Sequence, residues 1–160
     1  AELDGQTSKR AGIGTIAHEF SHVIGLPDLY DIDYGQNHEN EATPGAWHIM
    51  DGGSYNNDGK TPPNYTIYDK YFLGWVDMEN PGDEAQVLTM AAGEGYQIAS
   101  SDSKLAANST NSVYYIENRQ QSGWDKYLPG HGLVIWRIMY SQSVWEANGP
   151  NANLALYAMQ

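Results

Sequence analysis

The chain of 160 residues contains no cysteine. Without thiols there is no disulfide framework, no thiolate metal site and no cysteine nucleophile. No apolar run approaches the roughly 18 residues that a membrane-spanning helix needs. The first ten residues, AELDGQTSKR, also lack the basic start and apolar centre of a signal peptide. These absences exclude thiol chemistry and a membrane span.

Positive charge is scarce, because 8 Lys and Arg stand against 20 Asp and Glu, for a net charge of −12. This balance excludes nucleic acid as a partner, since phosphate binding needs basic patches. Residues 11–59 contain no Lys or Arg at all. Uncompensated negative charge close to histidines favours a bound cation. The acidic residues of this stretch are Glu19, Asp28, Asp31, Asp33, Glu39, Glu41, Asp51 and Asp58.

An apolar fraction of 41% and an aromatic fraction of 12% are those of a folded protein. Apolar residues at three- and four-residue spacing predict a helix over 12–24, which Gly25 ends before Leu-Pro. Gly, Asn, Asp and Pro predict a long structured loop over 31–64. A second helix is predicted over 65–75, and strands follow after about residue 80. Their segments are 86–90, 95–99, 113–118 and 132–138.

The first helix carries the motif HEFSH, with His18 and His22 one turn apart. On a helical wheel His22 lies about 40° and Glu19 about 100° from His18, while the apolar side chains cluster between about 140° and 260°. Two imidazoles at this spacing can both reach one Zn²⁺ at roughly 2.0–2.1 Å. A glutamate offset from them can instead take a proton from water at the ion. The motif predicts a catalytic zinc site with Glu19 as general base.

A catalytic zinc takes three protein ligands, and several residues compete for the third place. Asp28 is favoured because Gly25 allows a sharp reversal of the chain, which returns the aspartate to the end of the helix. Glu39 or Glu41 would need a rigid later helix, which NHENEATPG does not predict. His38 and His48 have no spacing argument behind them.

H-E-x-x-H-x-x-G followed by a third ligand, with a methionine downstream, resembles the metzincin zinc peptidases. The fuller segments AGIGTIAHEFSHVIGLPDLYD, WHIMDGGSYNN, KYFLGW, YYIENRQ and LPGHGLVIW resemble the immune inhibitor A-like metallopeptidases. The resemblance implies zinc ligands at His18, His22 and Asp28, Glu19 as the general base, and Met50 in the Met-turn. It also implies an α+β fold. Residues 1–80 would be the C-terminal part of a metzincin-like catalytic domain, and residues 81–160 a β-rich region packed on it.

Only 17 residues precede His18, too few for the sheet that lies upstream of the active-site helix in this family. The apolar face of residues 13–24 would then lack its usual partner. We therefore expect the chain to be a segment of a longer protein whose upstream part completes the domain. Alternatively, another chain or the β-rich half covers this face.

The function expected is that of a secreted zinc endopeptidase, which hydrolyses protein or peptide substrates with a metal-activated water. The alternative is a catalytically inactive segment or an extracellular binding module that keeps the metal site for structure. A hydrolase of other amides or esters is a third possibility. Oxygen ligands for a Ca²⁺ ion are also available, although their spacing matches no calcium loop. These are Asp31, Asp33, Asn37, Glu39 and Asp51.

Overall fold

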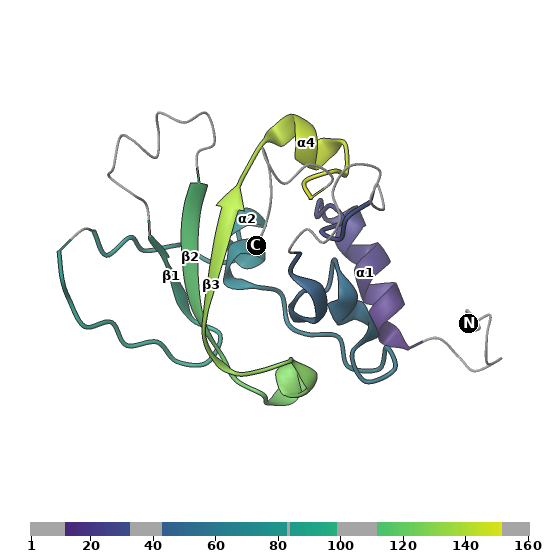
Figure 1. Cartoon of the computed structure of the whole chain (residues 1–160), viewed down its shortest axis with the longest axis horizontal. Coiled ribbons are helices and arrows are strands. Elements are labelled where there is room, and N and C mark those ends of the chain that lie inside the picture. The colour runs from purple at the N-terminus through teal and green to yellow at the C-terminus, as the bar shows by residue number, and fades with distance from the viewer. Residues whose placement is uncertain (1–11, 33–42, 83, 99–111, 152–160) are drawn as a thin grey trace.

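The computed structural model describes residues 12–32, 43–82, 84–98 and 112–151. These residues form short helices and one sheet, and none of their helices has the length and apolar character needed to cross a membrane. Figure 1 shows the sheet at one side of the molecule and the first helix at the other, with irregular turns between them. The elements in chain order are α1 (Ile13–Val23), η1 (Gly45–Trp47), η2 (Gly52–Tyr55), α2 (Ile67–Phe72), β1 (Gly95–Ile98), β2 (Ser112–Arg119), η3 (Gly123–Tyr127), β3 (Gly132–Met139) and α4 (Gln142–Glu146).

The sheet is antiparallel in the order β1-β2-β3. In β2 and β3 alternate side chains point to the core, since successive residues of a strand face opposite sides. Tyr115 pairs with Trp136 on the buried face, where both side chains are less than 6% exposed. On the outer face Leu133 and Ile135 are 61% and 57% exposed. One face of the sheet therefore builds the core.

The predicted helices and three of the four predicted strands are confirmed, and with them the α+β class. The predicted strand over 86–90 is wrong: these residues pair with no strand in the described part of the chain, and Val87 is 95% exposed. An alternating segment forms a stable strand only when one of its faces is buried, and here Leu88 and Met90 are only half-buried. The division into regions 1–80 and 81–160 stays a prediction.

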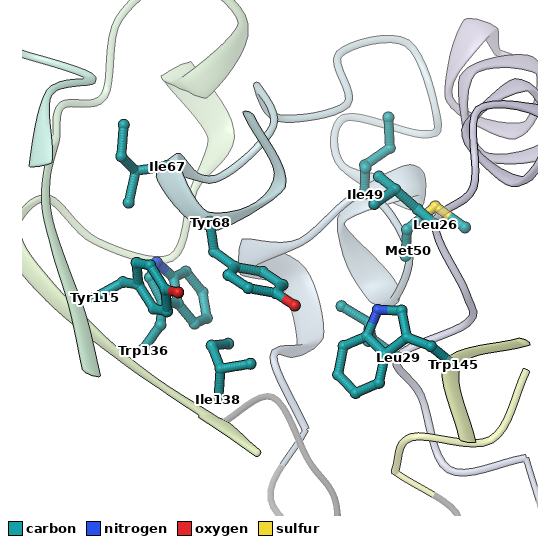
Figure 2. Close-up of a cluster of buried hydrophobic side chains, with 10 residues drawn as sticks. All are labelled: Leu26, Leu29, Ile49, Met50, Ile67, Tyr68, Tyr115, Trp136, Ile138 and Trp145. Atoms are coloured by element: carbon teal, nitrogen blue, oxygen red, sulfur yellow. The ribbon is translucent and has the colours of Figure 1, made fainter. Parts of the chain in front are cut away.

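The core joins the β-rich half to the helical half. Figure 2 shows the Tyr68 ring of α2 between side chains of the sheet and those around Met50. Tyr68 makes edge contacts with Tyr115 of β2, at 5.1 Å between ring centroids, and with Trp145 of α4, at 6.5 Å. Burial raises the pKa of the Tyr68 phenol, and it raises that of Tyr115 to about 12. Both phenols therefore remain neutral in this core at physiological pH.

Helix α1 packs through small residues rather than through its apolar stripe. Gly14 and Ser21 are buried, and a Cβ at Gly14 would lie 1.9 Å from the Ser54 carbonyl oxygen. The Gly14 amide donates to Gly59 O at 2.7 Å, and the Ser21 hydroxyl lies 2.7 Å from the Tyr65 hydroxyl. Glycine at position 14 thus lets the helix backbone contact both η2, at Ser54, and the loop that follows it, at Gly59.

The apolar stripe of α1 is exposed in the structure. Exposed fractions are 50% for Ile13, 62% for Ile16, 58% for Phe20 and 78% for Val23. The wheel places these side chains between about 140° and 220° from His18, whereas the packed face lies between about 260° and 320°. The alternative that the β-rich half covers this stripe is therefore wrong for the described residues, because the sheet lies on the other side of the loops (Figure 1).

Charged side chains lie inside the contact between β2 and the start of α2. Arg119 is 1% exposed and pairs with Glu117 at 3.2 Å and with Asp125 at 2.7 Å. Glu117 also accepts from the indole of Trp136 at 2.6 Å and from the backbone amide of Ile67 at 3.1 Å. Every charge of this cluster has a partner, and the cluster ties α2 to the sheet.

A second buried contact connects α2 to the loop before it. The Asp69 carboxylate closes the capping box of α2 by accepting from the Thr66 amide and hydroxyl, each at 2.8 Å. The same oxygen lies 2.8 Å from Nε2 of His48, which is completely buried. On the other side of the ring, Nδ1 accepts from the Met50 amide at 3.0 Å. Asp69 thereby holds the segment that contains residues 48–50.

Replacing Arg119 with methionine should strongly lower the stability of the fold. The substitution leaves Glu117 and Asp125 buried without a cation, a change that costs roughly 3–5 kcal/mol in comparable pairs. We expect a large loss in the urea-unfolding free energy. The control is Lys60→Met, because the Lys60–Asp58 pair is exposed and should contribute roughly 0–1 kcal/mol. Equal losses in the two variants would show that the buried cluster is not stabilising.

The Asp69 contact should make stability fall in acid. Burial alone raises the pKa of this carboxyl, but the contacts with His48 and Thr66 outweigh it and hold the pKa below its ordinary value of 3.8. A lowered pKa stabilises the fold above about pH 4, and this contribution is lost as the pH falls through the native pKa. In Asp69→Asn the amide oxygen can accept the same contacts without titrating. The unfolding free energies of wild type and variant should therefore converge between pH 5 and pH 2.5, and parallel curves would contradict this.

Candidate metal centre

His18 and His22 project from the same side of α1. Their ring centroids are 5.0 Å apart and the ring planes are almost perpendicular, at 89°. Each ring is held by a backbone carbonyl at its Nδ1 atom: His18 contacts Ile49 O at 2.9 Å, and His22 contacts Leu26 O at 2.8 Å. A carbonyl oxygen only accepts hydrogen bonds, so each Nδ1 carries a proton. In a neutral ring the Nε2 lone pair is then free for a metal ion.

Asp28 reaches these two histidines by a reversal at the end of α1. Gly25 has a φ of +105°, and the Leu26 amide returns to Ser21 O at 3.0 Å. The Asp28 side chain is buried, with the residue 7% exposed. Its Oδ1 atom lies 3.0 Å from His18 Nε2 and 3.3 Å from His22 Nε2. The three side chains predicted as ligands therefore meet at one point.

The donor set fits a zinc ion. Ligand atoms around tetrahedral zinc at 2.0–2.1 Å are separated by roughly 3.3–3.4 Å, close to the two distances from Asp28 to the histidines. Asp28 Oδ1 is a buried oxygen that has no hydrogen-bond donor among the residues that the structure describes. A carboxylate oxygen that faces two imidazole lone pairs is unfavourable unless protons or a cation lie between them. Two neutral imidazoles and one carboxylate leave a fourth position for water.

The other carboxylate oxygen of Asp28 accepts a hydrogen bond from Asn148, a residue far away in the sequence. Asn148 Nδ2 donates to Asp28 Oδ2 at 2.7 Å, and the Asp28 amide donates to Asn148 Oδ1 at 2.6 Å. Asn148 is 120 positions away in the sequence and was not among the predicted site residues. The dipeptide Asn-Gly after α4 does signal a left-handed residue at a helix end, and Asn148 has a φ of +58°. This sequence signal does not indicate that Asn148 bonds to Asp28.

Glu19 lies between the two histidines in sequence, on the exposed surface of α1. An exposed position beside the ligands is compatible with access to water. Its role as general base stays a prediction, as do the ligand roles of His18, His22 and Asp28.

The competing ligands are placed elsewhere or lie outside the described residues. His48 is buried against Asp69, and Asp51 accepts from the Gly45 and Gly52 amides. Among the described residues, His18, His22 and Asp28 form the one group of three or more such side chains able to share a metal ion. A calcium site therefore has no support in this part of the chain. Outside the described residues lie Asp33, Asn37, His38, Glu39 and Glu41.

Two further features surround the centre. Met50 is fully buried, and its carbonyl accepts from the Leu29 amide at 2.9 Å, one residue after Asp28. A cavity of about 460 Å³ opens beside His22. Its lining is largely apolar and includes Leu26, Pro27, Phe72, Tyr140 and Trp145.

Comparison with known proteins agrees with this chemistry. Immune inhibitor A of Bacillus thuringiensis subsp. alesti is 39% identical over 63 residues, which cover 38% of this chain and 9% of that protein. A putative secreted metallopeptidase of Arthroderma benhamiae is 33% identical over 81 residues, which cover 42% and 12%. The chain thus spans about a tenth of the length of these curated relatives. No solved structure matches it.

Residues 6–76 match the family described as immune inhibitor A peptidase M6, catalytic domain. This stretch contains α1, both histidines, Asp28 and the loop to α2. The resemblance drawn from the motifs is confirmed for this part of the chain, which is similar to the immune inhibitor A metallopeptidases.

Proposed function

We propose that the chain is part of a zinc-dependent endopeptidase, with His18, His22 and Asp28 as the metal ligands and Glu19 as the general base. One observation carries the proposal: a buried aspartate oxygen without a donor lies 3.0 and 3.3 Å from two imidazole nitrogens. The family match supplies the reaction class, which is peptide hydrolysis.

Each residue has a chemical task in this proposal. His18, His22 and Asp28 would hold a zinc ion, which would supply Lewis-acid chemistry for the scissile carbonyl and for water. Glu19 takes the proton of the attacking water and later delivers it to the leaving amine. The Ile49 and Leu26 carbonyls hold the imidazoles in the tautomer that leaves Nε2 free. The largely apolar cavity beside His22 would receive a substrate side chain.

We also propose that the whole protein is secreted and that a further part of it packs on α1. Secretion rests on the name of the Arthroderma relative. The packing rests on the exposed stripe Ile13, Ile16, Phe20 and Val23, since adjacent apolar side chains of this size are usually covered in a folded domain.

Replacing Asp28 with alanine should abolish zinc binding. The variant keeps two imidazoles but loses the only anionic ligand, so chelator competition should show at least a hundredfold weaker affinity. The control is Asp31→Ala, which removes an acidic side chain three residues further on. Zinc affinity that stays at the wild-type level in Asp28→Ala would reject the ligand assignment.

Replacing Glu19 with glutamine should separate binding from catalysis. The amide cannot accept the proton of water, so cleavage of a casein substrate should fall by 10²–10⁴-fold while zinc stays bound. The assay uses the parent protein that contains this segment. Unchanged cleavage would reject the mechanism.

The same assay distinguishes the alternatives. Wild-type protein that binds zinc but cleaves no substrate would be a non-catalytic binding module with a structural metal. Zinc-dependent activity on esters or small amides alone would indicate a hydrolase of another class.

A further inference from the structure

We infer that Asn148 is a positioning residue for the candidate metal centre. It fixes the Asp28 carboxylate so that Oδ1 faces the two histidines. The inference rests on the proposed zinc site and extends it. It assigns to the C-terminal, β-rich part of the chain a role in binding the metal.

The contact between the two side chains is reciprocal. The Asn148 amide nitrogen donates to Asp28 Oδ2 at 2.7 Å, while its carbonyl oxygen accepts from the Asp28 backbone amide at 2.6 Å. A pair of bonds to both the side chain and the backbone of one residue prevents rotation of the carboxylate. Because Oδ2 is occupied, Oδ1 remains for the metal, next to His18 and His22.

The backbone around Asn148 is built to hold this side chain. Trp145 of α4 is 6% exposed in the core, and the Asn148 amide donates back to its carbonyl at 3.0 Å. Asn151 is fully buried and donates to the carbonyl of Leu29, the neighbour of Asp28. Residues 148–151 therefore form hydrogen bonds with two successive residues, Asp28 and Leu29.

This position needs a residue that tolerates a left-handed backbone and that carries a donor and an acceptor on one side chain. Asparagine meets both requirements. It adopts the left-handed backbone, here with a φ of +58°, more easily than most residues. Its amide offers one donor and one acceptor on the same group. Aspartate is similar in size and also tolerates this backbone, but it would place a second negative oxygen against Asp28 Oδ2. Outer partners of metal ligands typically change metal affinity by 10–100-fold when they are lost.

The test is zinc affinity measured by chelator competition on wild type, Asn148→Gly and Asn148→Asp. Glycine removes the side chain and accepts the positive φ, so it isolates the lost contact from backbone strain. Both variants should bind zinc 10–100-fold more weakly. The matched control is Asn57→Gly, because Asn57 also has a positive φ, of 53°, and its side chain donates to Thr61 at 2.9 Å. This control should retain the wild-type affinity.

A second readout separates positioning from general destabilisation. With Co²⁺ in place of zinc, the visible absorption reports the number and arrangement of ligands. The second carboxylate of Asn148→Asp also destabilises the metal-free chain, so the spectra are compared on folded, cobalt-loaded protein. The Asn148→Asp spectrum should differ from that of wild type. An unchanged spectrum of the folded fraction would show a merely structural role and would overturn the inference.

The outcomes for the two proposals are distinct. If Asp28→Ala loses zinc but both Asn148 variants bind it as tightly as wild type, the inference about Asn148 is wrong and the zinc site stands. If wild-type protein binds no zinc, the proposed function fails and the inference fails with it. If Asn148→Gly does not fold, the affinity and spectrum of Asn148→Asp decide.

Discussion

The structure around the candidate metal centre depends on how the two oxygens of the Asp28 carboxylate are used. Asp28 gives one oxygen to Asn148 and leaves the other facing His18 and His22. A buried anionic oxygen without a donor costs free energy, and a cation removes that cost. The turn at Gly25 brings Asp28 to the two histidines, and Asn148, which follows α4, holds the other carboxylate oxygen.

The loop before α2 links this centre to the sheet through a series of short polar contacts. Glu117 of β2 accepts from the first residue of α2, and Asp69 of α2 holds His48. His48 accepts from the Met50 amide, and the neighbouring carbonyl of Ile49 orients His18. The contacts made by Glu117, Asp69 and the Met50 amide are buried, so water does not compete for them. The β-rich half thus supports one histidine through the loop and Asp28 through Asn148.

The local chemistry of the centre could be predicted from the sequence, because its three side chains lie within eleven residues. Helical geometry places two of them together, and the glycine provides the reversal that brings the third. The packing of α1 could not be predicted in this way, since periodicity shows which face is apolar but not whether a partner covers it. Gly14 and Ser21 form the packed face through close backbone approach, which hydrophobicity does not reveal. Likewise, Glu117 and Arg119 occupy inward positions where apolar residues are expected, and Asn148 acts across 120 positions.

The most direct test of the central claim is an anomalous-scattering map at the zinc absorption edge, recorded from crystals of the parent protein and paired with elemental analysis. We expect one zinc ion per chain, bound by Nε2 of His18, Nε2 of His22 and Oδ1 of Asp28. A zinc peak elsewhere, or an intact protein in which Asp28 points away from both histidines, would contradict it.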